Sequence, residues 1–111
     1  MNSAYQVDRD RWARFTIFEQ MGNIGSEIGR TFLAGRRNDS EGVRNAMARA
    51  LDLFEATVET LVKVKSPRTK EVLRAKDQFL QIVSNQTFHS AQAEGLERYF
   101  MAFALAARAS R

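Results

Sequence analysis

Histidine is the side chain that most often transfers protons near neutral pH, and this chain has one, His89. One type of helical RNA-cleaving site places an arginine a few residues before the histidine. The positions at that distance from His89 hold Ile82, Val83 and Ser84. No serine and acid accompany His89 at a spacing that fits a catalytic triad. We therefore expect His89 to be an exposed loop residue or a helix cap, and we expect no catalytic residue and no enzyme activity.

Metal and cofactor sites have equally little support. The sequence has no cysteine, which excludes disulfides and thiolate ligands, and one histidine cannot supply the two Glu-x-x-His motifs of a di-metal helical bundle. Gly22, Gly25 and Gly29 could mark a phosphate-binding loop, but no strand precedes them and no Gly-Lys-Ser/Thr follows. We expect no metal and no cofactor. Each glycine costs a helix about 1 kcal/mol, so we expect the three to permit close packing of a neighbouring helix.

A polar stripe lies opposite these glycines on the same predicted helix. Its members are Glu19, Asn23, Ser26 and Arg30, with Glu27 beside them. The stripe is either a small binding site or a solvated face with pairs such as Glu27 and Arg30. Side chains three or four residues apart on a helix lie close enough to pair, which favours the solvated face.

The elements that carry these residues are helices, because apolar residues recur at spacings of three and four nearly throughout. Turn and capping residues separate the periodic segments, including Gly35 with Asn38, the pair Ser66-Pro67, and Ser90. We expect one domain, residues 1–111, with helices at about 10–35, 40–64, 67–85 and 91–109. The predicted core faces are Phe18, Met21, Gly25, Ile28 and Phe32; Val43, Met47, Ala50, Phe54, Val58 and Leu61; Val72, Ala75, Phe79 and Val83; and Leu96, Tyr99, Phe100, Phe103 and Ala107.

Short connections between four amphipathic helices predict an all-α, antiparallel up-down four-helix bundle. A three-helix arrangement with a detached fourth helix is the alternative. The outward face of the second helix should carry Asn45, Asp52, Glu55, Glu59 and Lys63.

Composition excludes several classes of protein. Hydrophobic residues make up 44% and charged residues 27%, which excludes general disorder. No run approaches the roughly 20 apolar residues of a membrane span, and Met1 to Asp10 lack the apolar segment of a secretory signal. We expect a cytoplasmic protein with no membrane partner.

Positive charge gathers at one predicted end of the bundle. The net charge is +4, and an up-down topology brings together the start of the first helix, the turn between the second and third, and the end of the fourth. Such an end could hold phosphates with salt-dependent affinity, and it could equally be a solvated end whose cations favour helix C-termini. We name this end the basic pole. Its candidate nucleic-acid-binding residues are Arg9, Arg11, Arg14, Lys63, Lys65, Arg68, Lys70 and Arg108, with Arg111 beside them.

The last predicted helix is apolar both on its core face and on the opposite face. From Tyr99 to Ala107 there is no charge, and the residues opposite its core face are also apolar. We name these residues the apolar strip and expect it to be a homo-oligomer interface, because exposed apolar surfaces of this kind mark contacts. Two alternatives remain: its members are tolerated singly on the surface, or the segment around Tyr5 and Trp12 covers them. The apolar strip consists of Met101, Ala102, Leu105 and Ala109.

Two segments carry a resemblance to known proteins. Residues 22–30 read GNIGSEIGR and residues 99–108 read YFMAFALAAR. These two segments carry a resemblance to a set of short, uncharacterised bacterial proteins. The resemblance extends over most of the chain. In size, basicity and helix count the chain also resembles the four-helix-bundle accessory proteins of diversity-generating retroelements. That second resemblance, of architecture, implies a ring-like homopentamer that binds nucleic acid and a reverse transcriptase.

These observations favour a function in binding. We expect a non-enzymatic, homo-oligomeric helical protein that binds RNA, DNA or a nucleic-acid enzyme through its basic pole, in an accessory role. The alternative is a protein-interaction or assembly module with no nucleic-acid role.

Overall fold

The structure, a computed structural model, describes residues 6–109 and has five helices in that range. The part of the chain described contains no strand, so the all-α prediction is confirmed, although the helices number five rather than four. They are α1 (Arg9–Ala13), α2 (Ile17–Arg36), α3 (Ser40–Lys63), α4 (Thr69–Asn85) and α5 (Ala91–Ala109).

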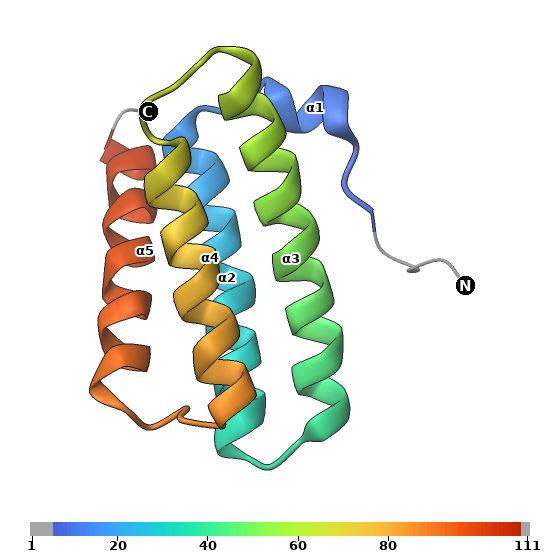
Figure 1. The fold of residues 1–111 in the computed structure, drawn as a ribbon, viewed down its shortest axis with the longest axis vertical. Coiled ribbons are helices and arrows are strands. Elements are labelled where there is room, and N and C mark those ends of the chain that lie inside the picture. Colours follow the sequence, from blue (N-terminus) through green and yellow to red (C-terminus); the bar gives the residue numbers. More distant parts are fainter. Residues whose placement is uncertain (1–5, 110–111) are drawn as a thin grey trace.

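The four long helices lie side by side as a bundle, and successive helices run in opposite directions (Figure 1). α2 packs extensively against both α3 and α5, whereas α4 and α5 touch each other sparsely. The short α1 packs on α3. The bundle is therefore tightly joined along α2 and more open between α4 and α5.

The extra helix arises from a break near the N-terminus, where the expected continuous helix over 10–35 is wrong. Thr16 is the N-cap of α2: its hydroxyl accepts a hydrogen bond from the Glu19 backbone N–H at 3.1 Å. The Glu19 carboxylate in turn accepts from the Thr16 backbone N–H at 2.8 Å. This reciprocal capping box starts a new helix and lets α1 leave the axis of α2.

The start of α4 also differs from the sequence prediction, which placed it at Pro67. Ser66 does accept a hydrogen bond from a backbone N–H, that of Arg68 at 3.1 Å, but its carbonyl also accepts from the Thr69 hydroxyl. These bonds form a turn, and α4 begins at Thr69.

Three helices end on a non-glycine residue in the left-handed region. Asn38, Lys65 and Gln86 have φ values of 58°, 54° and 56°. In each case the next backbone N–H bonds to a carbonyl five residues back, as in a Schellman motif; for Gln86 this is the bond from Thr87 to Ile82 at 3.1 Å. Each motif satisfies carbonyls that the helix end would otherwise leave unpaired.

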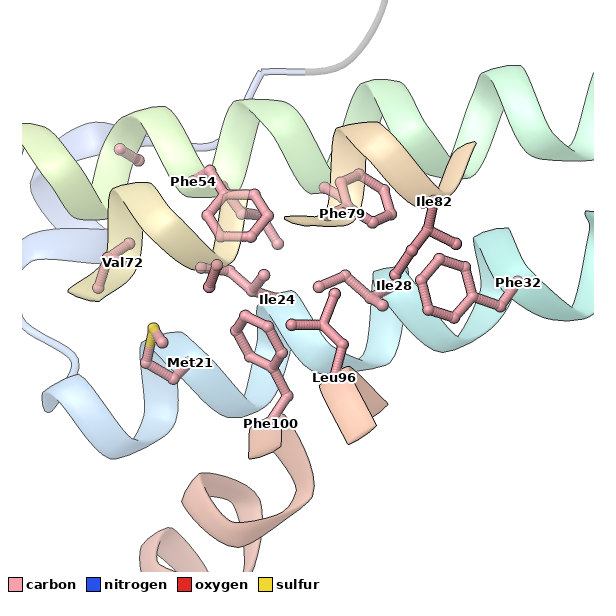
Figure 2. Packing of buried hydrophobic residues seen from close by; sticks show 14 of the residues in the cluster. Met21, Ile24, Ile28, Phe32, Phe54, Val72, Phe79, Ile82, Leu96 and Phe100 are labelled. Carbon is pink, nitrogen blue, oxygen red and sulfur yellow. The ribbon is translucent and has the colours of Figure 1, made fainter. Parts of the chain in front are cut away.

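The core lies between the four long helices, each of which contributes side chains to it (Figure 2). Four phenylalanines within it are almost completely buried, with neighbouring ring centroids about 6 Å apart. The predicted core faces are confirmed at their fully buried members, such as Met21, Phe54 and Leu96. Other predicted members are only partly buried: Phe18, Gly25, Val43, Met47, Val58, Val83, Tyr99 and Phe103. The four rings belong to Phe32, Phe54, Phe79 and Phe100.

The glycines of α2 differ in how tightly they pack. A Cβ built on Gly25 would lie 2.7 Å from the Cβ of Phe100, and one on Gly22 would lie 3.2 Å from the Cα of Ala104. At Gly29 the nearest atom outside the helix is a Glu97 carboxylate oxygen at 3.9 Å. Close packing of α2 on α5 is therefore confirmed at Gly22 and Gly25 but not at Gly29.

Candidate nucleic-acid interface

The three basic segments lie at one end of the bundle. The junction of α1 and α2, the turn between α3 and α4, and the end of α5 all meet at the top of Figure 1. Arg111 lies outside the described residues. The remaining predicted residues of the basic pole differ in how they are held.

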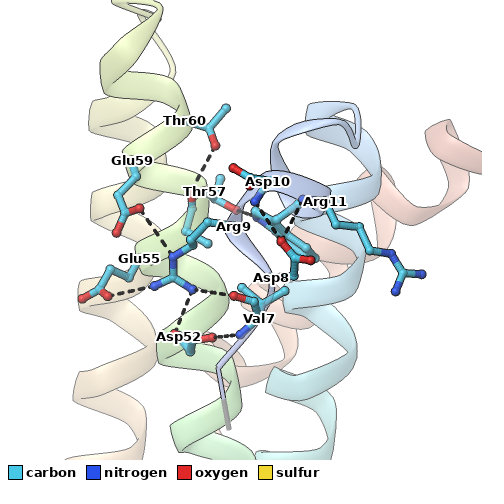
Figure 3. Close-up of polar contacts among 12 residues, drawn as sticks. Val7, Asp8, Arg9, Asp10, Arg11, Asp52, Glu55, Thr57, Glu59 and Thr60 are labelled. Carbon is cyan, nitrogen blue, oxygen red and sulfur yellow. Dashed lines mark hydrogen bonds and ion pairs between the residues drawn. The ribbon is translucent and has the colours of Figure 1, made fainter.

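Arg9 is bound to acidic residues of α3. Its guanidinium lies 3.1 Å from Asp52, 3.0 Å from Glu55 and 3.4 Å from Glu59 (Figure 3). Burial lowers the Arg9 pKa, but the hydrogen bond to Asp52 and the charges of the three carboxylates outweigh burial, so that the pKa is raised. The cation of Arg9 is thus already neutralised within the chain.

The sequence pattern placed Asp52 on the outward, solvated face of its helix. In the structure Asp52 is instead largely covered. Its side chain is 12% exposed and accepts a hydrogen bond from the Val7 backbone N–H at 2.7 Å besides the one from Arg9. Asp52 is therefore the anchor that holds the N-terminal segment on α3.

Trp12 completes this attachment. Its indole N–H donates to the Thr57 hydroxyl at 2.9 Å, its side chain is buried, and its carbonyl accepts from the Gln20 side chain at 2.9 Å. We call residues 7–13 the strap. The sequence prediction missed the strap because it continued one helix through it; the Thr16-x-x-Glu19 spacing was the signal that could have revealed the break.

Six other predicted residues of the basic pole are exposed. Within residues 6–109 no carboxylate lies within ion-pair distance of their side chains. Arg11 points away from α3 in Figure 3 although it follows Arg9 by two residues. This set can offer its charge to a ligand: Arg11, Arg14, Lys63, Lys65, Lys70 and Arg108.

Arg68 is held at the edge of the pole. Its guanidinium lies 3.5 Å from the Glu71 carboxylate and 5.7 Å from the centre of the Phe103 ring. The other Glu71 oxygen accepts a hydrogen bond from the Tyr99 hydroxyl. Burial, followed by this hydrogen bond and the charge of Glu71, raises the pKa of Tyr99. Arg68, Glu71 and Tyr99 therefore link α4 to α5.

The polar stripe of α2 makes mainly local contacts. The Asn23 side chain donates to the Glu19 carbonyl at 2.8 Å, and the Ser26 hydroxyl donates to the Gly22 carbonyl. Glu27 is the exception, because it is buried and lies 2.9 Å from Arg30 and 3.0 Å from Arg49 of α3. The stripe is a solvated face apart from Glu27, which joins α2 to α3.

The apolar strip of α5 is open to solvent. Met101 and Leu105 are each 54% exposed, and Ala102 and Ala109 are exposed as well. Trp12 is buried against α3 and does not cover them, while Tyr5 lies outside the described residues.

Other candidate chemistry is sparse. His89 is exposed in the connection between α4 and α5. In the described range no three carboxylates or histidines are grouped so that they could hold a metal ion. None of the five helices there is long and apolar enough to cross a membrane.

Comparison with protein-family models, curated proteins and solved structures found no significant match to this chain.

Proposed function

We propose that this chain is a non-enzymatic helical protein that self-associates, as an up-down four-helix bundle with an added strap, and binds nucleic acid through its basic pole. One observation carries the proposal: six exposed cations, drawn from three separate segments, share one end of the bundle without a carboxylate partner among residues 6–109. Phosphate backbones attract such groups, and the release of counterions supplies much of the affinity.

The residues held in internal contacts define the limits of this surface. Arg9 is engaged by three carboxylates of α3, and Arg68 by Glu71 and the Phe103 ring. Phosphate contact is therefore left to the six exposed cations. We assign it first to Lys63, Lys65 and Lys70, because these three flank a single turn, the one between α3 and α4. Contacts made by charge give little sequence preference.

The test compares two double variants with the same change in net charge. Lys65→Glu/Lys70→Glu removes cations from the pole, and Arg37→Glu/Arg44→Glu removes two exposed cations at the opposite end. Fluorescence anisotropy with a labelled single strand at low salt should show binding by the wild type and by the control. The pole variant should bind at least tenfold more weakly, because two phosphate contacts are lost and like charges are introduced.

Circular dichroism melts should be similar for all three proteins, because every substituted side chain is exposed. Equal loss of affinity in both double variants would mean that net charge rather than the pole governs binding. Absence of wild-type binding at low salt would overturn the proposal.

A second candidate function is an assembly module without a nucleic-acid role. The observation that favours it is the apolar strip, in which Met101 and Leu105 are each 54% exposed. Self-association that persists while nucleic-acid binding is absent would select this candidate.

A further inference from the structure

A groove separates α4 from α5, where the two helices touch sparsely. It has a volume of about 690 Å³, within the roughly 300–1,000 Å³ typical of small-molecule sites. Its floor includes the buried side chains of Ile82 and Leu96, which are each 4% exposed. Its rim is mostly uncharged and polar, with four side-chain amides, those of Gln78, Gln81, Asn85 and Gln92.

The glycine in this groove has no packing role. Gly95 lies within α5, where glycine costs about 1 kcal/mol relative to alanine. A Cβ built on Gly95 would meet only an Arg98 guanidinium nitrogen, at 3.9 Å, whereas one on Gly25 would clash with Phe100. Helix packing therefore explains Gly25 but not Gly95. What Gly95 does provide is open space between the two helices.

One end of the groove adjoins the basic pole. Glu71, Arg74 and Tyr99 line this end, and Glu71 is in turn paired with Arg68. Tyr99 and Arg68 both satisfy the Glu71 carboxylate, so its charge is balanced. Arg74 is exposed and has no carboxylate within ion-pair distance among the residues described. The phosphates of a strand bound to the basic pole would therefore reach the groove next to the exposed Arg74.

We propose that the α4–α5 groove binds unpaired bases of a single-stranded nucleic acid whose phosphates lie on the basic pole. This inference rests on the proposed function and names its ligand class. A side-chain amide offers a donor and an acceptor together, which matches the edge of a base; asparagine and glutamine pair with adenine in this way. Proteins recognise single strands by binding bases that are splayed out of the stack. A duplex keeps its base edges paired, so it gains nothing from the groove.

The experiment separates the groove from the pole by using two probes. One is a labelled strand of about twelve adenine nucleotides, and the other is a strand of equal length and charge made of abasic sites. Both strands report phosphate contact, and only the first has bases. We expect the wild type to bind the adenine strand about tenfold more tightly or better, as expected for one well-made amide–base contact.

Gly95→Leu should fill the groove without disturbing the core, because nothing packs on Gly95. It should bring the ratio of the two affinities close to one and leave the abasic affinity unchanged. Gln78→Ala/Gln81→Ala should lower the same ratio by removing the amides. The control is Ala48→Leu, which adds the same side chain to an exposed position of α3 and should keep the wild-type ratio.

Equal wild-type affinities for the two strands at low salt would overturn the groove assignment while leaving the basic pole as the binding surface. Binding of neither strand would overturn both. A Gly95→Leu variant that keeps its preference for bases, with an unchanged melt, would also contradict the assignment.

Discussion

Gly25 and Gly95 are the same residue type on two packed helices, and their surroundings predict opposite effects of the same substitution. Gly25→Ala would force a Cβ to within 2.7 Å of the Phe100 Cβ, and overpacking of this kind costs about 1–3 kcal/mol. Gly95→Ala meets open space and should stabilise the protein by about 0.5–1 kcal/mol. Urea unfolding of both variants measures the two changes. Changes of the same sign would contradict this account of the α2–α5 contact.

Tyr99 makes stability depend on pH in the alkaline range. Its pKa is raised in the folded protein, so the protonated hydroxyl bound to Glu71 is favoured by folding. The resulting stability is fully present below the unfolded pKa of about 10 and is lost as the pH rises above it. The free energy of unfolding should therefore fall more steeply above about pH 10 in the wild type than in Tyr99→Phe. Parallel curves for the two proteins would refute this coupling.

At the scale of helices, periodicity was sufficient to predict the bounds of α3 and α5 closely and the centre of each buried face. It missed buried residues such as Leu53 and Ala93, and it placed the half-buried Tyr99 in the core. Apolar spacing follows directly from the helical repeat, so Phe54 and Phe100 could be assigned to the core from the sequence. The same rule failed at residues 14–16, because α1 and α2 are both helical and only the cap between them marks the change of axis. Periodicity also does not reveal a carboxylate such as Asp52 that binds a distant backbone N–H.

The strap should depend on Asp52 more than on its neighbours. Asp52→Ala removes the hydrogen bond to the Val7 N–H and the least exposed carboxylate partner of Arg9, and it should cost about 1–2 kcal/mol. Glu55→Ala is the matched control, since the Glu55 side chain is 67% exposed and its pairing with Arg9 should contribute less than about 1 kcal/mol. Urea unfolding gives the energies, and hydrogen exchange at the Val7 amide should accelerate in Asp52→Ala. Unchanged exchange there would contradict the anchoring role.

At the scale of the whole molecule, charge and topology together were enough to bring three basic segments to one end. They could not reveal which cations are already neutralised, because that depends on contacts such as those of Arg9 with α3. The groove between α4 and α5 was also beyond sequence reasoning. It depends on how far two helices stand apart, which apolar periodicity does not specify.

The apolar strip predicts self-association. Light scattering should give the wild type a mass above that of one chain at micromolar concentration, because burial of Met101 and Leu105 in a contact removes apolar surface from water. Met101→Glu/Leu105→Lys should yield a folded monomer.

Val62→Glu/Val64→Lys is the control for this prediction. It places the same charges on two valines of α3 and its C-cap that are 57% and 69% exposed, and it should keep the wild-type mass. A wild-type mass of one chain would refute self-association, and loss of association in both variants would locate the contact elsewhere.

The burial of Trp12 gives the protein a built-in optical reporter. Trp12 is the one tryptophan of the sequence, and it lies in the strap rather than in the four long helices. Release of the strap would expose the indole to water and shift its emission to longer wavelength, while the helical signal of the bundle would hardly change. Intrinsic fluorescence therefore follows one five-residue helix and its contacts, without a label, in a protein whose remaining aromatic residues are phenylalanine and tyrosine.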